Sequence, residues 1–432
     1  MMDKAKNYGY TILGKDVRAS NDTRETHLSN NLLVVGTTGS GKTGSVLYPN
    51  LKALNGASMV VVDTKGRLCA MFEKELKKKG YEVLTLDFVT PENSCRYNPL
   101  DYIRKNADGS YREQDIAKIA ASLMPVDFFG KDPFWAQSAR LVLEFIISFC
   151  LEALPDELHD IYSVSRLYRA FAKDGADEGF TDWLDANPSS FAKTRYDQIM
   201  ALRVADRTLS SVFGFVNVAL FPFDVREYRH IFESVKSEEN IGARVLDISR
   251  LGKKRTVLFL NISDSDHSAD ALVNLFYTQL LQTLIATADR NPDGTLDVPV
   301  SVCIDDFASG TVIPDFDKII SVVRSRNIWV SMFIQSISQL ESLYSKAVAT
   351  TIINNCSRIL YLGSNDLETA KFIGTRARKT PDTILAMDVT KEYLIEGGQP
   401  AVLINKVPPY SYEEEPTAKR RPKAAPKEAE YA

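Results

Sequence analysis

A glycine-rich segment, Gly36–Thr43, constrains the fold of this chain more than any other feature. Its sequence, GTTGSGKT, fits the pattern GxxxxGK[ST]. The apolar run Asn31–Val35 precedes it and predicts a buried strand, and a helix can follow from Lys42 to about Leu54. A strand, a glycine loop and a helix in this order predict a P-loop. A glycine-rich turn with a chance lysine is the alternative, and it would not require the strand.

The chemistry of this loop predicts a site for a nucleoside triphosphate and Mg²⁺. Glycines let consecutive backbone N–H groups turn toward phosphate oxygens, and the start of the helix adds partial positive charge. We expect Lys42 to reach the β- and γ-phosphates and the Thr43 hydroxyl to bind Mg²⁺. The residues predicted to contact the nucleotide are Gly36, Thr37, Thr38, Gly39, Ser40, Gly41, Lys42 and Thr43.

Two adjacent aspartates are candidates to complete the metal site. The apolar run Val298–Ile304 predicts a strand, and Asp305 and Asp306 follow it directly. Asp305 suits the Walker-B role of holding the Mg²⁺ shell, and Asp306 lies where NTPases commonly place a glutamate that polarises the attacking water. The alternative is a pair of aspartates that caps the next helix.

A glutamine and an arginine are further candidates for the reaction. Gln335 ends the predicted strand Ile328–Ile334, where an amide can sense the γ-phosphate or orient water; a capping or loop amide is the alternative. Arg324 precedes that strand. Supplied across a subunit interface, it could stabilise charge on the transferred phosphoryl group, while a surface ion pair is the alternative.

Alternating strands and helices predict an α/β fold with a mostly parallel central sheet flanked by helices. Several of the predicted strands are apolar throughout, as expected for strands covered on both faces. The segment from Leu123 to Ile231 instead has helical patterns with few strand signals, which predicts an inserted all-α domain. The other predicted strands are Met59–Val62, Val83–Leu86, Thr256–Leu260, Arg358–Leu362 and Ala401–Ile404.

These patterns divide the chain into three parts. Residues 1–122 and 232–408 are expected to form one discontinuous nucleotide-binding domain, and residues 123–231 the inserted helical domain. Residues 409–432 are rich in charge, proline and alanine, and we expect a disordered tail.

Composition excludes several classes of protein. Of the 432 residues, 44% are hydrophobic and 25% charged, which excludes a collagen, a coiled-coil rod and wholesale disorder. The net charge of −4 does not indicate a protein that binds polyanions over its whole surface. A local ring of basic residues is still compatible with this charge. The N-terminus has no signal peptide, and the apolar stretch Leu141–Leu154 contains two glutamates. We therefore predict a buried helix there and no membrane span in this chain.

The chain resembles the type IV secretion coupling proteins, the TraG/TraD-like ATPases of conjugation, which belong with the RecA-like hexameric DNA pumps. The resemblance extends from about Asn31 to about Pro408 and rests on segments in the family's order. These are VVGTTGSGKT (34–43), VVVDTKG (60–66), YNPL (97–100), DPFW (132–135), RTLSSVF (207–213), IDDFASGTVIPDFDKIISVVRSRNI (304–328), IQSISQLESLY (334–344) and LGSNDLETAKFIG (362–374).

The resemblance implies a RecA-like motor domain with an inserted all-α domain. It implies a homo-hexamer that uses ATP and Mg²⁺ to move single-stranded DNA with its relaxase, or protein effectors, into a type IV secretion channel. It assigns Lys42 and Thr43 to nucleotide and metal. It also makes Asp305 the Walker-B residue, Asp306 the catalytic acidic residue, Arg324 an arginine finger and Gln335 a γ-phosphate sensor.

The sequence departs from the family in three places. Asp306 stands where a glutamate is usual, and Thr64 replaces the proline of a DPKG motif. The family's usual N-terminal membrane helices are not found in this sequence, so we expect the chain in the cytoplasm, or at the inner face of the membrane through a partner.

Two other functions are alternatives to a pump. One is a nucleotide-switched adaptor with weak ATPase activity, and the other is a related RecA-like DNA-export or packaging ATPase outside conjugation.

Overall fold

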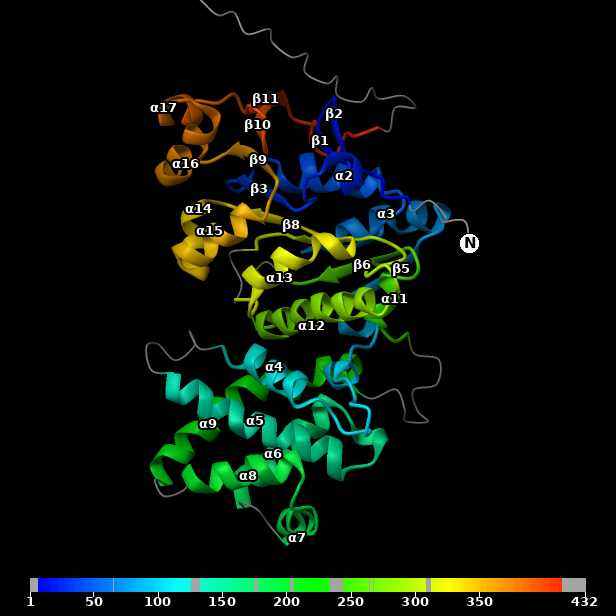
Figure 1. Ribbon diagram of the computed structural model, residues 1–432, viewed down its shortest axis with the longest axis vertical. Helices are drawn as coiled ribbons and strands as arrows, with labels where there is room; N and C mark the ends of the chain where they lie inside the picture. Colours follow the sequence, from blue (N-terminus) through cyan, green and yellow to red (C-terminus); the bar gives the residue numbers. More distant parts are fainter. Residues whose placement is uncertain are drawn as a thin grey trace, which may run out of the picture.

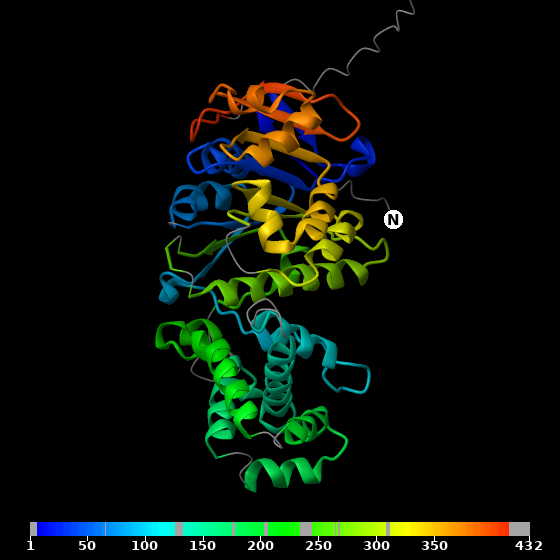
Figure 2. The ribbon, with the colours of Figure 1, turned by 90° about the vertical axis from the view of Figure 1, so that its left-hand side faces the viewer.

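The computed structural model describes residues 7–413, apart from residues 65, 126–132, 175–177, 203–205, 234–243, 264, 267 and 308–311. The chain forms two lobes. An α/β lobe contains the glycine loop, and a helical lobe lies at the other end of the molecule (Figures 1 and 2).

A mixed sheet forms the centre of the α/β lobe. In the described residues it has nine strands in the order β11-β10-β9-β3-β8-β7-β4-β6-β5. All neighbouring strands are parallel except where β10 pairs with β9 and β11. The predicted mostly parallel sheet is therefore confirmed. The strands are β3 (Leu32–Gly36), β4 (Ser58–Val62), β5 (Glu82–Asp87), β6 (Thr256–Asn261), β7 (Val300–Ile304), β8 (Ile328–Ile334), β9 (Arg358–Gly363), β10 (Lys391–Glu396) and β11 (Val402–Asn405).

Both faces of the sheet are covered, which explains why its central strands are apolar throughout. Along β3, Leu32 and Val34 pack in the core that contains α2 (Tyr48–Lys52) and α3 (Arg67–Lys78). Leu33 and Val35 pack in the opposite core, which contains α12 (Asp270–Asp289). Successive side chains of a strand point to opposite faces, so each apolar strand joins two cores. The other helices of this lobe are α1 (Thr23–Thr26), α11 (Ile248–Leu251), α13 (Phe316–Val322), α14 (Ile337–Tyr344), α15 (Lys346–Asn354), α16 (Leu367–Ala377) and α17 (Pro381–Leu385).

Three strands are absent from the sequence predictions. A two-stranded hairpin, β1 (Tyr10–Gly14) and β2 (Val17–Ser20), precedes the main sheet. The third is β10, whose sequence KEYLIE places charged residues at both ends of a short apolar centre. Its antiparallel pairing reverses the chain, so β11 runs in the same direction as β9.

The helical lobe is built from the middle of the chain. Helices α4 to α9 gather below α12, which runs across the molecule between this lobe and the sheet (Figure 1). Residues 409–413 of the predicted tail lie in the α/β lobe, and residues 414–432 are outside the described part. The helices are α4 (Glu113–Leu123), α5 (Pro133–Ala153), α6 (Ile161–Asp174), α7 (Glu178–Ala186), α8 (Phe191–Leu202), α9 (Asp206–Asp224) and α10 (Arg229–Phe232).

Helices α5 and α12 are long and apolar enough to cross a membrane by length and composition. In each, 72% of the most apolar window is buried inside the structure. Helices α9 and α10 pass the same test only as a pair, and they are bent by 56°. Helix α5 contains the apolar stretch predicted as a buried helix, and contacts within the chain account for its apolar character.

Candidate nucleotide-binding site

The glycine loop follows β3 at the carboxyl edge of the sheet, and its conformation requires glycine at three positions. Gly39 and Gly41 have φ angles of 81° and 98°, a region that other residues rarely adopt. A Cβ atom on Gly36 would lie 2.3 Å from the Ser40 Oγ. The chain then continues into a π-helical segment, η1 (Lys42–Leu47), and α2, in place of the single helix predicted to about Leu54.

Lys42 is folded back onto the loop that it follows. Its Nζ donates a hydrogen bond of 2.7 Å to the Gly36 carbonyl oxygen, and a second Nζ contact with the Thr37 carbonyl oxygen measures 3.4 Å. The side chain is buried, whereas Thr38 and Gly39 at the tip of the loop are exposed. The ammonium group therefore lies inside the curve of the loop, where phosphate oxygens can replace carbonyl oxygens as its partners.

Thr43 and Asp305 meet, although 262 positions separate them in the sequence. The Thr43 hydroxyl donates a hydrogen bond of 3.1 Å to the Asp305 Oδ2. Asp305 follows β7, which is separated from β3 by one strand, β8. Burial raises the pKa of the Asp305 carboxyl, and the Asp306 charge raises it further. A hydroxyl and a carboxylate side by side are the hard oxygen ligands that Mg²⁺ prefers, so this pair fits the metal.

Asp306 and Gln335 lie beside that pair. Asp306 has a φ angle of 47°, and its backbone N–H donates to the Asp305 Oδ1 at 3.0 Å. At this turn the Asp305 carboxylate contacts Thr43, whereas the Asp306 side chain is exposed to solvent. The Gln335 Nε2 lies 3.5 Å from the Asp306 Oδ1. An exposed carboxylate next to an amide can hold a water molecule at this end of the site.

Arg324 is not brought to this site within the chain. It belongs to a short helical turn, Arg324–Arg326, that precedes β8, so it lies at the amino edge of the sheet, opposite the glycine loop. Its side chain is exposed, and one guanidinium nitrogen donates to the His27 carbonyl oxygen at 3.0 Å. From this edge it cannot reach a nucleotide bound at the glycine loop of its own chain.

Two groups of residues that sequence reasoning missed support the site. Lys406 follows β11 and donates from its Nζ to the carbonyl oxygens of Ser40 and Leu362, at 3.0 and 2.8 Å. Asp366 and Thr369 hold the start of α14, directly after Gln335. The GSND segment gave a signal for Asp366, whereas nothing in the sequence pointed to Lys406.

Asp63, at the end of β4, has a structural role. Its carboxylate accepts hydrogen bonds from the backbone N–H groups of Arg67 and Cys69, at 3.0 and 2.9 Å. The DTKG segment therefore caps the first turn of α3 through its aspartate. Lys65 of this segment, for which the sequence leaves open a contact with phosphate or DNA or a simple turn, lies outside the described residues.

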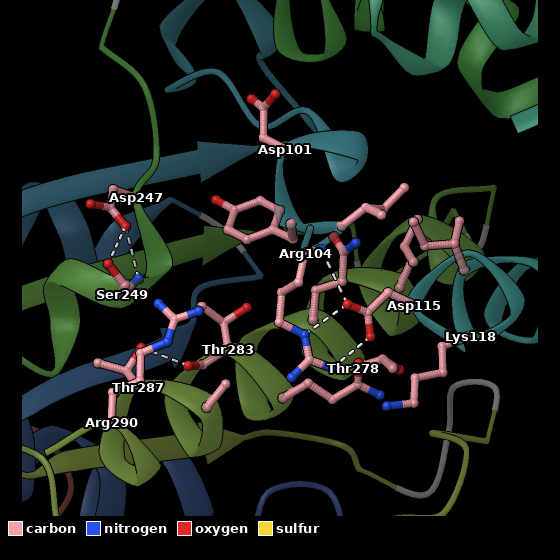
Figure 3. A pocket seen from close by; sticks show the side chains of 17 residues that line it. Asp101, Arg104, Asp115, Lys118, Asp247, Ser249, Thr278, Thr283, Thr287 and Arg290 are labelled. Atoms are coloured by element: carbon pink, nitrogen blue, oxygen red, sulfur yellow. Dashed lines mark hydrogen bonds and ion pairs between the residues drawn. The ribbon is translucent and has the colours of Figure 1, made fainter. Parts of the chain in front are cut away.

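A separate polar cavity of about 240 Å³ lies between α12 and α4 (Figure 3). Arg104 and Asp115 line it and are joined by guanidinium–carboxylate contacts of 2.7 Å, and Thr278 and Thr283 line it from α12. The cavity lies at the junction of the two lobes, away from the glycine loop at the carboxyl edge of the sheet.

The fold defines the class of the protein: a RecA-like P-loop fold. The coupling protein TrwB in its unbound form, TrwBdeltaN70, superposes with a TM-score of 0.67 at 17% identity, covering 93% of this chain and 89% of that one. TrwB in complex with ADP and Mg²⁺ gives 0.63 at 16% identity, covering 89% and 85%. VirB4 of Thermoanaerobacter pseudethanolicus gives 0.55 at 12% identity, covering 93% and 97%.

The sequence identifies the family. The profile of the family described as Type IV secretory system Conjugative DNA transfer matches residues 4–380. The chain therefore belongs to the conjugative DNA transfer family of type IV secretion systems. A comparison with curated protein sequences gave no match.

Proposed function

We propose that this protein is an ATP-driven motor that moves DNA, single-stranded and carrying its relaxase, or a protein substrate into a type IV secretion channel. The contact between the Thr43 hydroxyl and the Asp305 carboxylate is the observation on which the proposal rests, because it joins two oxygen groups suited to Mg²⁺ near Lys42, whose charge acts on the Asp305 carboxyl. Membership of a conjugative transfer family favours this function over a packaging motor outside conjugation.

The residues of the chain divide the work of ATP hydrolysis. The loop amides from Gly36 to Thr43 and the Lys42 ammonium hold the phosphates. Thr43 and Asp305 hold Mg²⁺, which when bound neutralises phosphate charge. Asp306 orients a water molecule and takes its proton as the water oxygen bonds to the γ-phosphorus and the bond to ADP breaks. Gln335 reports whether the γ-phosphate is present.

Arg324 extends the proposal to an assembly. The arginine lies at the opposite edge of the sheet from the glycine loop of its own chain, so it can act only on a neighbour's nucleotide. A closed ring, expected to be a homo-hexamer, would bring Arg324 of each subunit to the next active site. DNA would be held through its backbone charge, without base recognition. The chain would work in the cytoplasm, or at the inner face of the membrane through a partner.

ATP turnover with and without single-stranded DNA tests the proposal. We expect DNA to stimulate turnover and Lys42→Ala to abolish it. If nucleotide binds without turnover, even after Asp306→Glu lengthens the carboxylate, the protein is an adaptor switched by nucleotide. The short Asp306 side chain is the observation that supports this second candidate. A sizing measurement with nucleotide and DNA then reports the assembly.

A further inference from the structure

The segment that follows β11 lies along the outer side of the glycine loop. At one end, Lys406 donates from its Nζ to the Ser40 carbonyl oxygen at 3.0 Å. At the other end, the backbone N–H of Tyr410 donates to the Gly44 carbonyl oxygen at 3.1 Å. Between these two contacts the segment spans the loop and the first turn of η1. We call residues 406–412 the flanking segment.

Tyr410 is pressed against the position that follows Thr43. A Cβ atom on Gly44 would lie 2.9 Å from the Pro409 Cβ and 3.0 Å from the Tyr410 Cε2. Gly44 thus has no room for a side chain, because the flanking segment already fills that space. The glycine therefore allows the tyrosine ring to reach the start of the helix.

The Tyr410 ring contacts Tyr48 and is otherwise partly exposed to solvent. Its edge packs against Tyr48, with ring centroids 5.5 Å apart and planes at 77°. Tyr48 is buried, but Tyr410 remains 55% exposed. The backbone of Tyr410 has a φ angle of 58°, which is unfavourable for a residue other than glycine. An exposed aromatic side chain held in such a conformation indicates a function.

The polarity of a P-loop indicates what that function is. The lysine reaches the β- and γ-phosphates and the Thr43 hydroxyl binds Mg²⁺, whereas the amides at the start of the helix meet the α-phosphate. The ribose and base must therefore leave the loop beside Thr43 and Gly44, and Tyr410 is the exposed aromatic residue in contact with Gly44. Aromatic side chains stack on nucleobases irrespective of base identity.

We infer that Tyr410 forms one wall of a subsite for the nucleobase, so that the flanking segment distinguishes a nucleoside triphosphate from a bare polyphosphate. This inference rests on the proposed nucleotide site and assigns its base-binding part. Because every nucleobase has a flat face that can stack on an aromatic ring, the subsite accepts adenine and guanine nucleotides alike.

Equilibrium binding of two ligands tests the inference: Mg·ATP and inorganic tripolyphosphate with Mg²⁺. We expect Tyr410→Ala to weaken ATP binding about tenfold and to leave tripolyphosphate binding unchanged. Tyr410→Phe keeps the aromatic face and should bind both ligands like the wild type. Phe221→Ala removes an exposed aromatic ring from the helical lobe and is the matched control, with no effect on either ligand.

Three outcomes contradict the inference. If Tyr410→Ala weakens the binding of ATP and of tripolyphosphate equally, Tyr410 only supports the loop. If Tyr410→Ala leaves ATP binding unchanged, the ring touches no base. If Tyr410→Phe also weakens ATP binding, the hydroxyl and not the aromatic face is responsible. Failure of the proposed function looks different. In that case, wild-type protein binds neither ligand, or Lys42→Ala binds both as well as the wild type.

Discussion

At the scale of single residues, Asp305 is a buried carboxylate that we propose as a Mg²⁺ ligand, and we expect its burial to lower the stability of the metal-free protein. Burial raises the pKa of its carboxyl, so the ionised form is disfavoured in the folded chain without a cation. We expect Asp305→Asn to abolish turnover and yet to raise the Tm of the nucleotide-free protein by about 2 °C or more. Asp382→Asn changes an exposed carboxylate on α17 that has no part in the Asp305 environment, and it is the control, with no gain in Tm. A lower Tm for Asp305→Asn would contradict this account.

Glu392 gives a second prediction at this scale, for pH dependence. Burial raises the pKa of Glu392 to about 8, although the Lys406 charge opposes the shift. The unfolded chain releases that proton near the ordinary pKa of 4.5, so between pH 4.5 and about 8 only the folded state holds it. The unfolding free energy therefore falls as pH rises through this window, by up to about 1.4 kcal/mol per pH unit.

Denaturant unfolding at about pH 5 and about pH 7 measures this slope. Glu392→Gln should flatten it, because a neutral amide has no proton to release. Glu368→Gln, on the exposed surface of α16, should leave the slope of the wild type intact. Identical slopes for wild type and Glu392→Gln would show that Glu392 is ionised throughout.

At the scale of elements, α16 holds α14 and thereby Gln335. The Thr369 hydroxyl accepts the Ile337 backbone N–H at 2.9 Å, and the Asp366 Oδ2 accepts the Ser338 hydroxyl at 2.8 Å. Both bonds fix the first turn of α14, which begins two residues after Gln335. The GSND segment and Thr369 thus hold the turn that directly follows Gln335.

We expect Thr369→Val to lower kcat about threefold to tenfold and to leave KM for ATP unchanged, since misplacement of a reacting group affects turnover more than binding. Thr375→Val is a matched control on the same helix, because its hydroxyl donates to the Lys371 carbonyl oxygen within α16 and not to α14. A rise in KM without a change in kcat would assign Thr369 to nucleotide affinity instead.

The elements also show which parts of the site the sequence could predict. Thr43 and Asp305 each follow an apolar strand, and carboxyl ends of parallel strands share one edge, so their meeting was predictable. The contact of Lys406 with the glycine loop was not predictable. It depends on the pairing of β10 with β11, and the buried charged residue Glu392 makes β10 hard to recognise as a strand from its sequence. Tyr410 was assigned to the tail, because the charged and proline-rich residues that follow it dominate the composition there.

At the scale of the whole molecule, the YNPL segment joins the two lobes. The buried Tyr97 hydroxyl donates to the Gln279 side chain of α12, whose Nε2 donates to the Pro99 carbonyl oxygen at 2.8 Å. The Asn98 Nδ2 donates to the His159 carbonyl oxygen, in the helical lobe, at 2.7 Å. One short segment is therefore hydrogen-bonded both to α12 and to the helical lobe.

At the scale of the assembly, the position of Arg324 leads us to expect an active site shared between subunits, and mixing two variants that we expect to be inactive tests this. Lys42→Ala has a disabled loop but an intact arginine, and Arg324→Ala has the reverse. If Arg324 acts on a neighbour, a mixed ring restores function where an intact arginine faces an intact loop. This holds at about a quarter of the interfaces when equal amounts mix at random.

We therefore expect the mixture to regain turnover that neither variant has alone, measured at a concentration where the wild type assembles. Arg326→Ala is the control, because Arg326 pairs with Asp289 of its own chain at 2.8 Å, and this variant should be active without mixing. If the mixture stays as inactive as its components while the sizes show mixed rings, Arg324 does not act across the interface. The arginine would then hold only the His27 carbonyl oxygen that it contacts in its own subunit.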